Sequence, residues 1–222
     1  MNDMTIIYYT ANVEKESFEQ KVRDRILEVK GDLPLISVSQ KPLDFGENIC
    51  VGEVGYSYLN AFRQLLIGCK AAKTKFVIMA EADCMYPITG YFNFIPTDTN
   101  VTYTYDNVWI LWDDIDKYAG WKNKDKYHKK DMTHASLIYG REFLIDLLEK
   151  AFKGLPEWDA NINTIPFYPE KLKLESFRGD PIVCCKTAAA KNTGTKLVDG
   201  IEPQDEIWYW GRGRKLKERL FK

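Results

Sequence analysis

The sequence predicts a single α/β domain with a mostly parallel central sheet and helices on both of its faces. Two observations carry this prediction. Over the first third of the chain, short apolar runs of strand length alternate with stretches in which apolar residues recur every three or four positions. The chain has 222 residues, 45% of them hydrophobic, which is enough for one well-packed domain and few for two. Successive strand–helix–strand units imply right-handed crossovers, which put helices on both sides of the sheet.

Five elements are expected in this first third. The helix after the first strand takes Asn12 as its cap, with Glu14 and Glu16 in its first turn, and ends at Gly31. The third strand is apolar throughout, which favours a central position in a parallel sheet. The expected strands are 5–10, 35–38 and 76–80, and the expected helices are 12–31 and 58–69.

The rest of the chain is less regular. Residues 120–130 are polar and rich in lysine, which predicts an exposed loop, and 187–200 are small and polar, which predicts a mobile loop. The two histidines, His128 and His134, are expected at the surface. Further strands are expected at 101–105, 108–112 and 181–185, and a further helix at 143–152.

Charge and cysteine content exclude several classes of protein. The formal net charge of −1 gives no whole-molecule attraction to nucleic acid. Five cysteines without a Cys-x-x-Cys pair argue against a disulfide framework and a structural zinc site, so a reducing cytoplasm is expected. The first strand lacks the flanks of a signal peptide, and no apolar run reaches the roughly 18 residues of a membrane span. We therefore expect no integral membrane segment.

Polar residues follow the predicted strands at the rim where parallel sheets bind ligands. Glu81 and Asp83 leave the third strand one residue apart, where burial makes an uncompensated carboxylate costly. A divalent cation would compensate both, and could hold a nucleoside diphosphate as it departs. The alternative is structural: Glu81 caps a backbone amide and Asp83 begins a turn before Pro87.

Four stretches resemble successive motifs of bacterial and bacteriophage glycosyltransferases related to the large inverting family two. The resemblance extends from about residue 6 to about 194 and implies a GT-A (Rossmann-like) fold, a donor that is usually a UDP-sugar, and Mn²⁺ or Mg²⁺. It also implies a nucleotide-sugar-binding half at 1–87 and an acceptor half at 88–222. The stretches are SVSQKPLDFGENI at 37–49, FVIMAEADCMYP at 76–87, YDNVW at 105–109 and SLIYGREFL at 136–144.

Carried over by position, the resemblance assigns roles to individual residues. It implies Asp83 and Glu81 as metal ligands, and it places Thr10 and Asn12 at the nucleotide base. The family often has Glu-His-Asp where this chain has Glu-Ala-Asp, and a histidine near the carboxyl end that is missing here. Lys191 could neutralise the diphosphate instead, unless it is a solvated loop lysine. The remaining implied neighbours of the nucleoside are Lys41, Asp44 and Tyr58.

An inverting transfer also needs a general base to take the proton of the acceptor hydroxyl. The candidates are Asp106, Asp113, Asp114 and Glu142, of which Glu142 is favoured because it opens a helix after a motif on the acceptor side. The alternative for Glu142 is an exposed pair with Arg141 at the start of that helix.

Two basic clusters bear on the acceptor. They contain aromatic residues as well as lysine and arginine, a mixture that can hold phosphates and stack on bases. This suggests a hydroxymethylated pyrimidine in bacteriophage DNA, which would place the protein in the host cytoplasm; an anionic lipid or surface glycan is the competing acceptor. The chain could instead be a non-catalytic nucleic-acid-binding module, or the clusters plain solvated faces. The clusters comprise Trp121, Lys122, Lys124, Lys126, Tyr127, Lys129 and Lys130, and Trp208, Tyr209, Trp210, Arg212, Arg214, Lys215, Lys217, Arg219 and Lys222.

Overall fold

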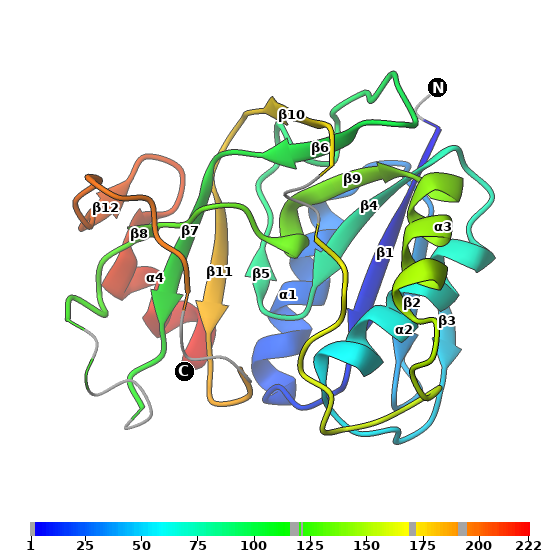
Figure 1. The fold of residues 1–222 in the computed structure, drawn as a ribbon. Coiled ribbons are helices and arrows are strands. Elements are labelled where there is room, and N and C mark those ends of the chain that lie inside the picture. The colour runs from blue at the N-terminus through cyan, green and yellow to red at the C-terminus, as the bar shows by residue number, and fades with distance from the viewer. Residues whose placement is uncertain (1–2, 116–119, 121, 169–171, 191–194) are drawn as a thin grey trace.

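The computed structural model describes residues 3–115, 120, 122–168, 172–190 and 195–222. It is a mixed α/β structure built on a large, mostly parallel sheet, as the sequence predicts (Figure 1). Within the described residues this sheet has seven strands in the order β10-β6-β9-β4-β1-β2-β3. Four of its six strand pairings are parallel, and the other two are those of β9.

The predicted alternation of strands and helices in the first third is confirmed. The central strand is β4, which lies between β1 and β9 and is buried along its apolar length. The edge strand β3 was not predicted, because its sequence is polar and it pairs on one side only. These elements are β1 (Met4–Thr10), α1 (Glu16–Val29), β2 (Leu35–Ser39), β3 (Glu47–Cys50), α2 (Tyr58–Ala71) and β4 (Phe76–Glu81).

The second part of the chain completes the main sheet and adds a smaller one. Strand β9 pairs antiparallel with β4 and β6, so the main sheet is continuous across the two predicted halves. The smaller sheet has the order β5-β11-β7-β8. The strands are β5 (Cys84–Met85), β6 (Thr102–Tyr105), β7 (Val108–Trp112), β8 (His128–Lys129), β9 (Leu137–Gly140), β10 (Leu174–Phe177), β11 (Ile182–Lys186), β12 (Glu206–Ile207) and β13 (Gly211–Arg212). The helices are η2 (His134–Ser136), α3 (Arg141–Ala151) and α4 (Gly213–Phe221).

Helices cover both faces of the main sheet (Figure 1). On one face, Phe18 and Val22 of α1 pack with Ile6 of β1, and α4 contacts α1 there. On the other face, Leu65 of α2 packs with Ile7 of β1, and α3 lies against α2. Successive residues of β1 therefore enter opposite cores, as the alternation of side chains along a strand requires. None of the helices in the described residues is both long and apolar enough to cross a bilayer.

Two local predictions are wrong. Helix α1 begins at Glu16 rather than after Asn12, because Asn12 has a φ of 53° and its Oδ1 accepts hydrogen bonds from the backbone amides of Gln40 and Lys41. Asn12 thus links the end of β1 to the end of β2. The lysine-rich loop is not exposed throughout, because its last part forms β8, in which His128 is buried against Trp112.

Candidate functional site

A cavity of about 350 Å³ opens at the carboxyl ends of β1, β2 and β4. This is the edge at which open parallel sheets bind ligands. Its lining includes charged side chains and larger aromatic and apolar ones. The carboxylates are Glu14, Glu81 and Asp83; the lysines are Lys130, Lys186 and Lys196; the larger aromatic and apolar groups are Tyr9, Tyr56, Tyr58, Phe62, Met132 and His134.

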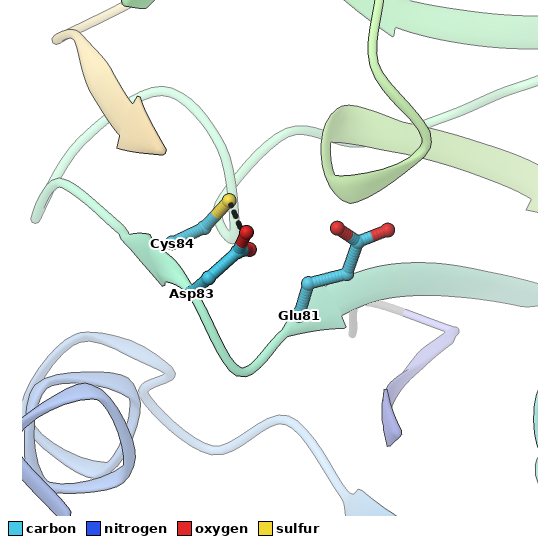
Figure 2. Close-up of side chains that lie close together, drawn as sticks. All are labelled: Glu81, Asp83 and Cys84. Atoms are coloured by element: carbon cyan, nitrogen blue, oxygen red, sulfur yellow. Dashed lines mark hydrogen bonds between the residues drawn. The ribbon is translucent and has the colours of Figure 1, made fainter. Parts of the chain in front are cut away.

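The acidic pair lies on the turn from β4 to β5. Figure 2 shows the carboxylates of Glu81 and Asp83 on the same side of this turn, with Cys84 beside Asp83. One ligand atom from each of the three residues lies within 4.8 Å of the other two. The Tyr9 hydroxyl donates a hydrogen bond of 2.5 Å to Glu81 Oε1, and the Cys84 thiol donates one of 3.4 Å to Asp83 Oδ1. The pair is therefore held in place before any ligand arrives.

The surroundings of the pair favour a bound cation. Burial raises the pKa of Glu81 to about 7 and the charge of Asp83 adds to this rise, while the Tyr9 hydrogen bond and the charges of Lys130 and Lys186 oppose it. Burial lowers the pKa of Lys130, but the neighbouring thiols and carboxylates outweigh that effect and the net change is upward. Carboxylate oxygens are the ligands that Mg²⁺ and Mn²⁺ prefer. Glu81 and Asp83 thus fit such an ion. Burial raises the pKa of Cys84, so its thiol remains a hydrogen-bond donor to Asp83.

Glu14 is a cavity residue that sequence reasoning missed, because Glu14 was expected in the first turn of α1. It lies before that helix, and Thr187 Oγ1 donates a hydrogen bond of 2.8 Å to its carboxylate. Burial raises the pKa of Glu14 to about 8, and the charge of Asp83 contributes to the rise. A carboxyl with this pKa can exchange a proton near neutral pH.

The lysines come from distant parts of the chain. Lys130 follows β8 and pairs as an isolated bridge with Leu197, and Lys186 ends β11. Lys196 forms an ion pair with Asp131, with its Nζ 2.5 Å from Asp131 Oδ2. The charges of Lys130 and Lys186 act on the Glu81 carboxylate, so the cavity combines positive with negative charge. Lys130 belongs to the lysine-rich segment 120–130, but the sequence contains no signal that predicts its proximity to Glu81.

The residues expected at the nucleoside divide into two groups. Thr10 and Tyr58 line the cavity. Asn12 and Lys41 do not line it. The Asn12 side chain accepts a hydrogen bond from the backbone just after β2. Lys41 is exposed, and its Nζ lies 3.8 Å from Glu53 Oε1. Asp44 is exposed and also outside the lining. Lys191 falls outside the described residues.

The structure does not bring the two predicted catalytic residues to the cavity. Strand β9 runs antiparallel to β4 with Gly140 opposite Phe76, so Glu142 lies at the far edge of the sheet from Glu81. Glu142 is exposed and ion-paired with Arg141, which is the alternative considered from the sequence. Asp106 lies between β6 and β7, 3.6 Å from Arg178, and does not line the cavity. His134, which was expected at the surface, is half-buried and lines the cavity against Phe62.

Comparison with known proteins identifies no family. No family model matches the chain, and no curated protein matches it. Among solved structures, the chain is similar to the bifunctional IspDF from Campylobacter jejuni, with 11% identity and a TM-score of 0.39 over 80% of this chain and 50% of that one. The chain thus spans about half the length of IspDF, and a likeness this weak supports no conclusion about function.

The predicted membership of the GT-A glycosyltransferases related to family two is therefore wrong, because no family model matches the stretches that suggested it. The physical reason lies in the motifs themselves. Two acids after a buried strand recur on unrelated folds, so they do not define a lineage.

Proposed function

We propose that this protein is a metal-dependent glycosyltransferase that moves a sugar from a nucleoside-diphosphate donor, with UDP as the nucleotide, to an acceptor hydroxyl. The observation that carries the proposal is the convergence of Glu81, Asp83 and three lysines on one cavity at the carboxyl edge of the main sheet. The proposal rests on this site and not on membership of a family. It includes a Rossmann-like arrangement of β1, α1, β2, α2 and β4 as the nucleotide-binding part.

Each group of cavity residues has a part in this reaction. Glu81 and Asp83 would hold Mn²⁺ or Mg²⁺, which supplies charge stabilisation for the departing diphosphate. Lys130 and Lys186 bind and neutralise phosphate oxygens that the ion does not reach. Tyr9 holds the Glu81 carboxylate in position through its hydrogen bond of 2.5 Å.

Glu14 takes the role of general base in this proposal, in place of Glu142 and Asp106. It is the described carboxylate that lines the cavity besides the metal pair, and its pKa of about 8 suits proton transfer near neutral pH. Its hydrogen bond from Thr187 leaves one carboxylate oxygen to accept the proton of the acceptor hydroxyl.

The acceptor is the least constrained part of the proposal. A hydroxymethylated pyrimidine in DNA requires free positive charge, and the structure leaves less of it than the sequence suggests. Lys129 is buried and Lys130 lines the cavity. In the carboxyl-terminal cluster, Arg212 pairs with Glu206 and Lys217 is buried between two aspartates. We propose DNA as one acceptor to test, beside a lipid or glycan hydroxyl.

The first experiment measures nucleotide binding by thermal shift with UDP, GDP and CDP, each with and without Mn²⁺. At a hundredfold excess over Kd, binding to the native state adds about 2.7 kcal/mol, which raises Tm by roughly 5–10 °C in a chain of this size. UDP is expected to give this shift with Mn²⁺ only. Asp83→Asn should abolish the shift, and Asp24→Asn on the exposed face of α1 should keep it. The absence of a shift with any nucleotide and Mn²⁺ would refute the proposal.

The second experiment follows transfer directly. Mass spectrometry of reactions with UDP-sugars and hydroxymethylated DNA, a lipid with a free hydroxyl or an oligosaccharide should show a hexose or pentose added to one acceptor. Sugar addition that does not depend on the metal, or that survives Asp83→Asn, would show that the pair has another role.

A further inference from the structure

Gln64 is a buried polar residue of α2 whose side chain reaches the cavity. It is 1% exposed and belongs to the cavity lining. Its Nε2 donates two hydrogen bonds to backbone carbonyls, 2.7 Å to Thr10 O and 2.9 Å to Val38 O. Both partners are acceptors, so the nitrogen must face them and the orientation of the amide is fixed. The Oε1 atom is thereby turned away from these strand ends.

Gln64 Oε1 itself has no hydrogen-bond partner among the residues that the structure describes. The residue is buried, but Oε1 is not one of the fully enclosed unsatisfied atoms among the described residues, so this oxygen is open to the cavity and free to accept from a ligand there. The other glutamine of the cavity differs in this respect. Gln40 donates to Gly55 O at 2.7 Å and accepts from Gly55 N at 3.1 Å, so its amide is engaged within the protein. Gln64 therefore presents a fixed acceptor with the cavity as its neighbour.

The position of this acceptor matches the dimensions of a nucleotide. Thr10 and Val38 lie at the ends of β1 and β2, while Glu81 ends β4, the neighbour of β1 on the other side. Strands lie about 4.8 Å apart, so Gln64 stands roughly 5–10 Å along the rim from the acidic pair. The α-phosphate and the ribose of a nucleoside diphosphate would fill such a gap between the acidic pair and the base. Ala11 and Ala61 also line the cavity, and their small side chains leave room for a flat ring.

We propose that Gln64 Oε1 accepts a hydrogen bond from the ring imide N–H of the donor's base and so selects uracil over cytosine. This inference rests on the proposed function and specifies its nucleotide. Uracil carries a hydrogen on N3, where cytosine carries a lone pair that would face the lone pairs of Gln64 Oε1. The fixed amide cannot rotate to offer its nitrogen instead without breaking both hydrogen bonds to the strand ends.

The test compares UDP, CDP and N3-methyluridine diphosphate by calorimetric titration in the presence of Mn²⁺. The wild-type protein should bind UDP at least about tenfold more tightly than either of the others, the magnitude of one lost hydrogen bond with an unpaired buried acceptor. Equal affinity for UDP and its N3-methyl derivative would overturn the inference, and this result requires no variant. Gln64→Met should bind UDP and the N3-methyl compound equally, and Gln20→Met, on the exposed side of α1, should keep the wild-type preference.

The outcomes separate this inference from the proposed function. If no nucleoside diphosphate binds with Mn²⁺, the proposed function fails and the role of Gln64 falls with it. If UDP binds and its N3-methyl derivative binds equally well, the proposed function stands and only the role of Gln64 is wrong. Should Gln64→Met unfold because Thr10 O and Val38 O lose their donor, the comparison of ligands on the wild-type protein still decides.

Discussion

Replacing Glu14 by glutamine should stabilise the protein at alkaline pH while it abolishes sugar transfer. The pKa of Glu14 rises from its ordinary value of 4.5 to about 8 in the folded protein, chiefly through burial. The folded state therefore binds this proton more tightly than the unfolded state does. The contribution of Glu14 to the free energy of unfolding is therefore greatest below pH 4.5, falls as the pH rises towards 8, and changes no further above that.

The magnitude follows from the same pKa. A rise from 4.5 to about 8 corresponds to about 5 kcal/mol at ~1.4 kcal/mol per pH unit. Glu14 is only partly buried at the cavity, so solvent screening reduces this value, and we expect about 2–3 kcal/mol. Glutamine keeps the oxygen that accepts from Thr187 but carries no charge.

Urea denaturation at pH 5 and pH 8.5 measures the effect. Glu14→Gln and wild type should differ little at pH 5 and by about 2–3 kcal/mol at pH 8.5, with unchanged m-values. Glu53→Gln serves as the control, because the Glu53 side chain is 78% exposed and should show no such difference. If the free energies of unfolding of Glu14→Gln and wild type differ by the same amount at both pH values, the reasoning is refuted, because Glu14 would then not titrate in this range. Retained transfer activity in Glu14→Gln would remove it as the base.

Three further predictions concern the same structure. Asp83→Asn should lose binding of Mn²⁺, measured by electron paramagnetic resonance of the free ion, with an unchanged circular dichroism spectrum; binding that persists would place the metal elsewhere. Tyr9→Phe removes a hydrogen bond that lowers the pKa of Glu81, so the acidic limb of the pH–rate profile should move to higher pH, and a shift to lower pH would contradict the role of Tyr9. Lys217→Ala should lower the free energy of unfolding by about 2 kcal/mol in urea, since Lys217 Nζ is buried 2.6 and 2.9 Å from two exposed aspartates; a change below about 0.5 kcal/mol would show that these contacts do not hold α4 in place.

For the acidic pair, the sequence predicted the position in the fold but neither the family nor the neighbouring residues. The position of Glu81 and Asp83 after an apolar strand predicted their place at the rim of the sheet, and the structure puts them there. The same pattern did not identify a family, because two acids after a strand recur on unrelated folds. It also said nothing of Lys130 and Lys186, which approach the pair only when β8 and β11 join β7 in the smaller sheet.

Apart from the edge strand β3 and the start of α1, the sequence by itself determined the strands and helices of the first third, and with them the rim on which the acidic pair stands. The spacing of apolar residues is enough to predict these elements, because a helix or strand has to bury its apolar face whichever neighbour it packs against. Only the tertiary structure decided which distant residues share the cavity with that pair. The antiparallel insertion of β9 carries Glu142 to the opposite edge, and the start of α1 at Glu16 leaves Glu14 facing the cavity. Strand order and direction are settled by contacts between residues far apart in the chain, which no local pattern records.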